Sequence, residues 1–262
     1  MSSTCGRVTE VERDSTLACS SRLREDGPVD DKPLKVYRGQ WPMTVVCGAS
    51  GTGRTRFAYA LAARYNGHVI DTSDVLEAVR AMTGPGQQPE LFYEAAEDWR
   101  DFVEAAGAGS KRRQPLTGTA EELAAARLRA ADALFPAVKA VAAQQPRLRL
   151  DGFNETPHTV VTGRHALPTL AFDFVVILTE TEEQIRANLK ARLGPDDFLD
   201  LRARTSVLVQ NELIRRAQAH RQNQPHCDVV YIDAQPWSDT VKRAYSEMSD
   251  WWDYRTALGG MW

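Results

Sequence analysis

The run Gly48-Ala49-Ser50-Gly51-Thr52-Gly53-Arg54-Thr55 has the residue types and spacing needed to bind phosphate. It matches the P-loop pattern G-x-x-x-x-G-K-[ST], except that arginine occupies the lysine position. Glycines let the backbone curl so that several N–H groups point at phosphate oxygens, and a helix beginning there adds the positive end of its dipole. The predicted nucleotide-binding residues are Gly48, Ser50, Gly51, Thr52, Gly53, Arg54, Thr55 and Arg56.

Arg54 and Thr55 decide what this loop can do with a nucleotide. Arg54 stays cationic and can donate to two phosphate oxygens, although it is bulkier and differently hydrated than lysine. Thr55 is placed to bind Mg²⁺ through its hydroxyl, so ATP and Mg²⁺ are the predicted ligands. Three readings remain open: a catalytic P-loop, a degenerate one that binds nucleotide without catalysis, and a glycine-rich turn that binds none.

Two aspartates follow the second predicted strand, residues 68–70. Asp71 and Asp74 are predicted to contact the acceptor of the phosphoryl group, because this edge of a P-loop kinase faces the γ-phosphate. Asp74 is the preferred catalytic residue, because a carboxylate there can orient the attacking hydroxyl and accept its proton late in the transfer. The alternative is that Asp74 caps its own helix, since Asp74 and Glu77 fit the D-x-x-E pattern.

A third group of polar residues follows the predicted strand 147–150. Asp151 stands where a strand-ending carboxylate would hold Mg²⁺ through water, although an ordinary turn explains it too. The polar segment 153–167 is predicted to line the acceptor pocket. Its predicted substrate-binding residues are Asn154, His158 and Arg164.

Basic residues cluster around the helix break at Gly194-Pro195. A lid over residues 186–206 would supply positive charge to the transferred group and exclude water. Arg192 and Arg204 are the predicted catalytic members, while most charges on such helices form a solvated face. The run Lys111-Arg112-Arg113 could meet an anionic acceptor, but a solvated loop is the preferred interpretation.

Apolar periodicity alternates between strands and helices along the chain. Such alternation predicts an α/β fold with a five-stranded parallel sheet flanked by helices, and ligands bind beyond the carboxyl ends of such strands. The predicted strands are 43–47, 68–70, 147–150, 174–178 and 229–232. The predicted helices are 55–66, 74–82, 89–106, one from Thr119 that Pro136 kinks or interrupts, 181–192, 196–221 and 238–254.

Composition limits the other possibilities. With 262 residues and a formal net charge of −3, the chain suits one catalytic domain at 39–262 and gives no charge-based case for nucleic-acid binding. Residues 1–38 lack periodicity and are interpreted as a polar arm. No apolar run suits a membrane span, no cysteine pair has metal-ligand spacing, and the polar start resembles no secretory signal. A cytoplasmic protein with a small-molecule partner is expected, and its oligomeric state is left open.

These residues together resemble P-loop small-molecule kinases, especially 2-phosphoglycerate kinase and, more distantly, chloramphenicol phosphotransferase. The resemblance rests on residues 48–55, 73–78, 150–152, 208–217 and 229–233, and spans about 43–245. It implies the fold of nucleoside monophosphate kinases and a role for Asp74 at the acceptor hydroxyl. Asp151-Gly152-Phe153-Asn154 departs from the phosphoglycerate kinase motif, so a specialised metabolite, an antibiotic, a nucleoside or a nucleotide is an equally open acceptor.

Overall fold

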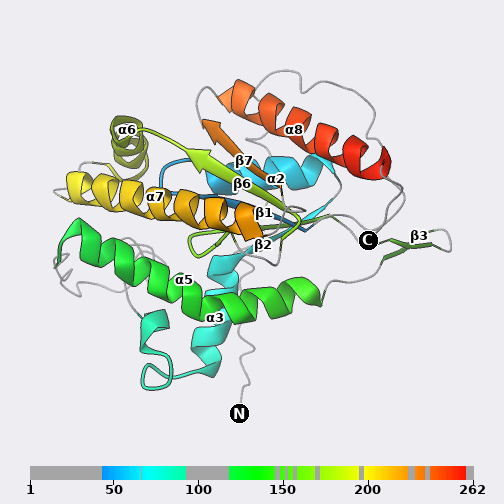
Figure 1. Ribbon diagram of the computed structural model, residues 1–262. Coiled ribbons are helices and arrows are strands. Elements are labelled where there is room, and N and C mark those ends of the chain that lie inside the picture. Colours follow the sequence, from blue (N-terminus) through cyan, green and yellow to red (C-terminus); the bar gives the residue numbers. More distant parts are fainter. Residues whose placement is uncertain are drawn as a thin grey trace, which may run out of the picture. The chain divides into compact units, whose positions relative to one another are not determined.

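The computed structural model describes residues 43–65, 67–92, 118–144, 148–150, 153–155, 158–168, 172–194, 198–223, 228–233 and 237–257. Strands and helices alternate along these residues, as Figure 1 shows. In chain order the elements are β1 (Met43–Gly48), α2 (Arg54–Arg64), β2 (His68–Asp71), α3 (Thr72–Met82), the 3-10 turn η2 (Pro89–Phe92), α5 (Ala120–Ala143), β3 (Leu148–Leu150), β4 (Phe153–Glu155), β5 (Thr159–Thr162), β6 (Phe174–Thr179), α6 (Glu182–Leu193), α7 (Leu199–Asn223), β7 (Asp228–Asp233) and α8 (Trp237–Ala257). The predicted arm, 1–38, lies outside the described residues.

Five strands form one parallel sheet in the order β2-β5-β1-β6-β7. The strand that leads into the glycine-rich loop, β1, is therefore the central one. Parallel strands bring their carboxyl ends to one edge, so the loops after β1, β2, β5 and β6 share that edge. The predicted α/β fold with a five-stranded parallel sheet flanked by helices is confirmed.

Alternate side chains of β1 point to opposite faces of the sheet. Val45 and Cys47 pack in a core with residues of α3, α5 and α7, whereas Val46 packs in a core with residues of α2 and α8. Figure 1 shows the same division of helices between the two faces. All three side chains are fully buried, as expected for a central parallel strand covered on both sides.

The third strand of the sheet is not the predicted one. Residues 148–150 form β3, which pairs antiparallel with β4 in a separate two-stranded sheet. The strand between β2 and β1 is instead β5, the run Thr159-Val160-Val161-Thr162, whose side chains are at most 1% exposed. Four successive β-branched residues suit a buried central strand better than the alternation of Leu148-Arg149-Leu150 does.

Pro136 does not interrupt α5, which runs continuously over 24 residues. A proline inside a helix removes one backbone donor, so the carbonyl four residues earlier, that of Asp132, loses its partner. Both residues are exposed, and water can therefore satisfy that carbonyl. The predicted interruption is corrected accordingly.

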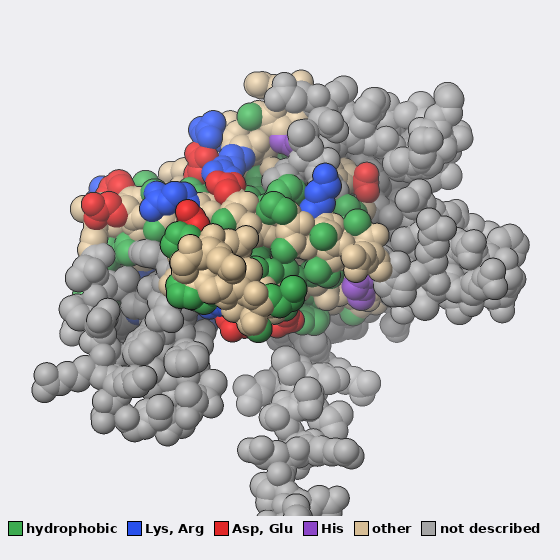
Figure 2. All heavy atoms as spheres, turned by 90° about the horizontal axis from the view of Figure 1, so that it is seen from below, with side chains coloured by type: hydrophobic (Ala, Val, Ile, Leu, Met, Phe, Trp, Pro, Cys, Tyr) green, Lys and Arg blue, Asp and Glu red, His purple; other side chains and the backbone are tan. Residues whose placement is uncertain are grey.

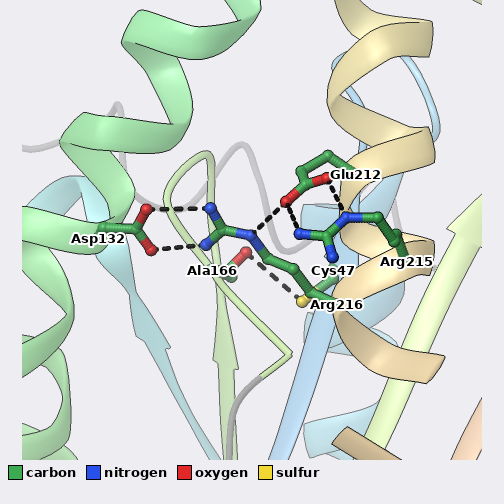
Figure 3. A network of polar contacts seen from close by, with 6 residues as sticks. All are labelled: Cys47, Asp132, Ala166, Glu212, Arg215 and Arg216. Carbon is green, nitrogen blue, oxygen red and sulfur yellow. Dashed lines mark hydrogen bonds and ion pairs between the residues drawn. The ribbon is translucent and has the colours of Figure 1, made fainter. Parts of the chain in front are cut away.

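A network of charged side chains joins α5 to α7, as Figure 3 shows. The Arg216 guanidinium donates to both Asp132 oxygens, at 2.5 and 3.0 Å, and to Glu212 at 2.9 Å. Arg215 donates to both oxygens of the same Glu212, each at 2.7 Å. Hydrogen bonds from Arg215 and then from Arg216 lower the pKa of Glu212 to about 2.

This network predicts an acid-dependent loss of stability. A carboxyl whose pKa is lower in the folded chain stabilises it above the ordinary glutamate pKa, about 4.3, and that contribution disappears as the pH falls toward 2. Urea unfolding of Glu212→Gln should therefore depend less on pH across that window than wild type. The difference should stay below about 1 kcal/mol, because the pair is partly solvent-exposed. Exposed Glu183 provides the control Glu183→Gln, and an unchanged acid dependence in Glu212→Gln would contradict the prediction.

Among the described residues, no helix combines the length and apolar character that crossing a membrane requires.

Candidate functional site

The glycine-rich loop joins the central strand to α2. Gly53 adopts a left-handed conformation, φ +78°, and is the N-cap of the helix, where glycine avoids the strain of a Cβ. No side chain caps this helix, and its first turn contains Arg54 and Arg56 but no acid. The other described helices with assigned N-caps have a capping side chain and an acid in their first turn, the caps being Asp71 for α3, Thr119 for α5 and Thr181 for α6.

That contrast gives the start of α2 a distinct chemistry. The first amides of a helix need acceptors, and its positive dipole end favours anions over arginines. Acids and capping hydroxyls meet this need in α3, α5 and α6. At α2 the sequence supplies only donors and positive charge, so an external anion such as phosphate is the fitting partner. With the sheet order, this loop confirms the predicted P-loop NTPase fold.

Contacts with α6 support the glycine-rich loop. Asn188 of α6 donates from Nδ2 to the Gly51 carbonyl at 2.7 Å. Ala49 packs in a buried cluster with Ile185 and Leu189 of the same helix. The Thr52 hydroxyl donates to the Ala49 carbonyl at 2.9 Å. These contacts set the loop's conformation before any ligand binds, which lowers the cost of ordering it on binding.

Arg54 spans the loop from its end to its beginning. Its guanidinium donates through Nη1 to the Gly48 carbonyl at 2.7 Å, and the residue is half-buried. Thr55 and Arg56 beside it are exposed. A guanidinium has five N–H donors, so its bond to Gly48 is compatible with donation to a phosphate as well.

Asp71, and not Asp74, caps α3. The Ser73 amide donates to Asp71 Oδ1 at 2.8 Å, and the helix begins at Thr72. Asp74 therefore lies inside the first turn, where its exposed carboxylate makes no hydrogen bond or ion pair. The capping explanation of Asp74 is removed, and its carboxylate remains available to an acceptor hydroxyl.

Asp71 also borders the end of β5. It lies opposite Thr162 in the sheet register, and the following residue, Gly163, has φ +114°. A Cβ on Gly163 would lie 2.5 Å from Asp71 Oδ1 and closer still to the Thr72 hydroxyl. Only glycine permits this close approach, which brings the turn with Arg164 against the start of α3.

His158 lies away from this edge, so its assignment to the acceptor pocket is corrected. It directly precedes β5, and its Nε2 lies 2.9 Å from the Thr44 hydroxyl near the start of β1. It is 1% exposed, and its ring meets Tyr65 edge to face. Burial lowers the pKa of His158 to about 3, so it is a neutral core histidine at the opposite edge of the sheet from the P-loop.

The histidine on the site's side is His165, two residues after Gly163. Its backbone amide donates to the Thr72 hydroxyl at 3.1 Å, and the residue is 7% exposed. Burial, aided by the charges of Arg164, Arg127, Arg54 and Arg80, lowers the pKa of His165 to about 3. A signal in the sequence could have located His165. The β-branched run before Gly163 ends in glycine, as does the apolar strand before the P-loop, and this likeness marks a strand whose end lies at the same edge of the sheet.

The structure describes one of the two predicted metal ligands, Thr55. The strand between β2 and β1 is β5, which ends in Thr162-Gly163-Arg164 without a carboxylate, and Asp151 lies outside the described residues. Asn154 lies in β4, which belongs to the separate two-stranded sheet. Within the described ranges, no group of three or more metal-binding side chains occurs. Mg²⁺ in kinase sites commonly takes one or two protein groups besides phosphates and water, so the exposed Thr55 hydroxyl fits that role.

The predicted lid residues lie on α6 and α7. Arg192 is exposed in the last turn of α6. Arg204 is also exposed and lies 3.7 Å from Glu121 of α5. Arg202, another arginine of the same basic cluster, is buried. The lid and the catalytic roles of Arg192 and Arg204 remain predictions, and Lys111-Arg112-Arg113 lies outside the described residues.

Comparison with known proteins gives structural similarity only. No family model and no curated protein matches the sequence. Among solved structures, the chain is similar to a gluconokinase from Sinorhizobium meliloti 1021, at 16% identity and a TM-score of 0.41, covering 81% of this chain and 94% of that one. It is also similar to TT1252 from Thermus thermophilus, at 12% identity and a TM-score of 0.39, covering 80% and 97%. With both TM-scores below 0.5, the fold assignment stands on the sheet order and the P-loop geometry.

Proposed function

We propose that this protein is a kinase that transfers the γ-phosphoryl group of ATP to a hydroxyl of a small molecule. The observation that carries the proposal is the uncapped, acid-free start of α2 behind the glycine-rich loop. Asp74 supports transfer over simple binding, because it is an unpartnered carboxylate on the helix after β2, at the same edge of the sheet. β2 is two strands from β1, or about 10 Å across the sheet, a spacing that suits an acceptor between them.

Each residue has a defined task in this proposal. The loop amides and Arg54 bind the β- and γ-phosphates, and Thr55 would hold Mg²⁺, which when bound neutralises phosphate charge. Asp74 orients the acceptor hydroxyl in line with the γ-phosphate and takes its proton late. Phosphoryl transfer needs little covalent help from the protein, so positioning and electrostatic stabilisation account for most of the rate. Arg192 and Arg204 are proposed to supply further positive charge if the segment closes.

The acceptor class is a separate proposal. The residues that resemble 2-phosphoglycerate kinase favour a phosphoglycerate-like compound, a specialised metabolite or an antibiotic. A nucleoside or nucleotide is the alternative within the same chemistry, and loops around the pocket would decide between them.

One observation favours a different class of function. Arg54 stands at the lysine position and donates to the Gly48 carbonyl of its own loop. A cation engaged in this way could leave the γ-phosphate poorly stabilised, giving a regulatory protein that binds nucleotide without transferring phosphate. In that case Arg54→Lys would gain transfer, whereas in a working kinase it would not.

Three measurements test the proposal in order. Calorimetry with ATP and Mg²⁺ should show binding, and ADP release should then depend on the acceptor across a panel of hydroxylated compounds. Phosphorylation of the acceptor, followed by ³¹P NMR, separates transfer from plain hydrolysis. Binding with no transfer to any acceptor, combined with gain of transfer in Arg54→Lys, would assign the regulatory function. Absence of nucleotide binding would overturn both.

A further inference from the structure

The carbonyl of Gly51, in the middle of the glycine-rich loop, faces α6. Asn188 of that helix donates to it from Nδ2 at 2.7 Å. The Oδ1 of Asn188 accepts a hydrogen bond from Gln184 Nε2 at 2.9 Å, one helical turn earlier. A carbonyl oxygen can only accept, so the nitrogen of the Asn188 amide must face Gly51. Gln184 binds the other end of that amide and holds it in this orientation.

The loop packs against α6 at the same point. Ile185 and Leu189, on either side of Asn188 in the helix, are fully buried and pack with Ala49 of the loop. Gly51 has φ +93°, and a Cβ there would lie 3.3 Å from the Ile185 carbonyl oxygen and 3.6 Å from the Leu189 side chain. This close packing keeps the Gly51 carbonyl within reach of Asn188.

The direction of the Gly51 carbonyl sets the direction of the next amide. In a planar trans peptide the C=O and N–H groups are antiparallel, so the Thr52 N–H points away from α6. It points across the turn at the Ala49 carbonyl, with 3.4 Å between nitrogen and oxygen, beyond the usual range of about 2.7–3.2 Å. The Thr52 hydroxyl donates to the same carbonyl at 2.9 Å. The amide bond is therefore a weak one, and a phosphate oxygen inside the loop could replace it.

Glycine at position 51 makes this peptide easy to rotate. Rotation changes ψ of Gly51 and φ of Thr52, and glycine tolerates a wide range of ψ. The β-branched Thr52 opposes a complete reversal, but smaller rotations would tilt its N–H out of the loop. They would also turn the Gly51 carbonyl, a negative partial charge, toward the place where phosphate oxygens would bind. The bond from Asn188 opposes both changes.

The direction of individual amides matters here because the overall charge of the chain does not attract an anion. The formal net charge is −3. Basic and acidic side chains lie interspersed on the described part of the face shown in Figure 2. Arg54 and Arg56 supply positive charge at the loop, but aligned amides are needed to orient a phosphate as well as attract it.

We propose that Asn188 is a positioning residue, which holds the peptide between Gly51 and Thr52 with its N–H directed at the bound phosphates. This inference rests on the proposed kinase function and adds a residue from outside the P-loop to the nucleotide site. Asn188 acts through the Gly51 carbonyl and does not itself contact the nucleotide.

The first test measures nucleotide affinity by calorimetry with Mg²⁺ and a non-hydrolysable ATP analogue. Asn188→Leu keeps the size of the side chain but has no donor, and should weaken binding about 3- to 10-fold, as expected for one hydrogen bond. Asn188→Asp should weaken it more, because a carboxylate oxygen repels the Gly51 carbonyl and turns it toward the phosphates. Asn188→Gln keeps an amide and should recover part of the loss. Tighter binding by Asn188→Asp than by Asn188→Leu would contradict the inference, because shape and not the donor would then matter.

The second test observes the Thr52 amide directly by ¹⁵N relaxation. In the wild type without nucleotide, its order parameter should be near the rigid value of about 0.85, and in Asn188→Leu it should fall below about 0.6. The saturating ATP analogue should restore it, because the phosphate then restrains the N–H. The Ile185 amide, inside α6, should stay rigid in both proteins. A general loss of stability would not single out Thr52 in this way.

The matched control is Gln222→Leu, which replaces an exposed amide in the last turn of α7 and should bind the analogue as the wild type does. If Asn188→Leu binds normally and Thr52 stays rigid, the inference is overturned while the kinase proposal stands. If the wild type itself binds no analogue, the kinase proposal fails and the inference fails with it. If Asn188→Leu does not fold, Asn188→Asp, which has the shape of asparagine, takes its place in both measurements.

Discussion

Asp74→Asn should lower kcat for phosphoryl transfer by about 100-fold or more, the lower end of the range for a lost general base. Asparagine keeps the size and some hydrogen bonding of the side chain but cannot accept the hydroxyl proton. Asp71 caps α3, so the helix should remain, and the loss of one first-turn charge at Asp74 should lower the stability of the fold by no more than about 1 kcal/mol. ATP affinity should also stay near wild type, because the loop and Arg54 are untouched. Steady-state ADP release, with an acceptor that the wild type phosphorylates, measures kcat. Calorimetry measures the ATP affinity.

The matched control is Asp250→Asn, which changes an exposed carboxylate on α8, across the sheet from α3. It should keep full turnover. Full turnover in Asp74→Asn would remove Asp74 from the mechanism. A loss of ATP binding in the same variant would show instead that its effect is structural.

Substitutions of Arg54 should show how much its charge, and how much its forked geometry, contributes to ATP binding and turnover. Arg54→Gln should weaken ATP binding about 10- to 100-fold, as expected for losing charge-assisted hydrogen bonds to phosphate. Turnover should fall further, because negative charge on the transferred group is no longer offset. Arg54→Lys should keep ATP affinity within about tenfold, since the cation remains although the forked geometry is lost. Calorimetry and ADP release measure both variants.

The bond from Arg54 to the Gly48 carbonyl makes a second readout possible. Arg54→Gln weakens that bond too, so thermal unfolding without nucleotide shows how much of the effect belongs to the loop itself. Arg243→Gln on α8, where Arg243 pairs weakly with Glu247 at 3.9 Å, is the control for removing an exposed arginine. ATP binding by Arg54→Gln equal to that of wild type would show that Arg54 does not contribute to binding the phosphates.

The sequence by itself determined the P-loop, the fold class and most elements of the sheet. Residues 48–55 have a local pattern, because glycine conformations and a helix start are decided by near neighbours. The strands β1, β2, β6 and β7 are likewise visible as short apolar runs, since a buried parallel strand needs little besides hydrophobic side chains.

Only the tertiary structure decided which histidine lies at the site and which strand adjoins β1. Strand pairing depends on contacts between distant residues, and local pattern cannot distinguish 148–150 from β5 as the partner of β1. Because β5 occupies this place in the sheet, the polar residues at the site's edge are Arg164 and His165, and not the predicted Asn154 and His158. Burial of Arg127 depends in the same way on how α5 packs, because a charged residue on a helix reads as solvent-exposed until a neighbouring element covers it.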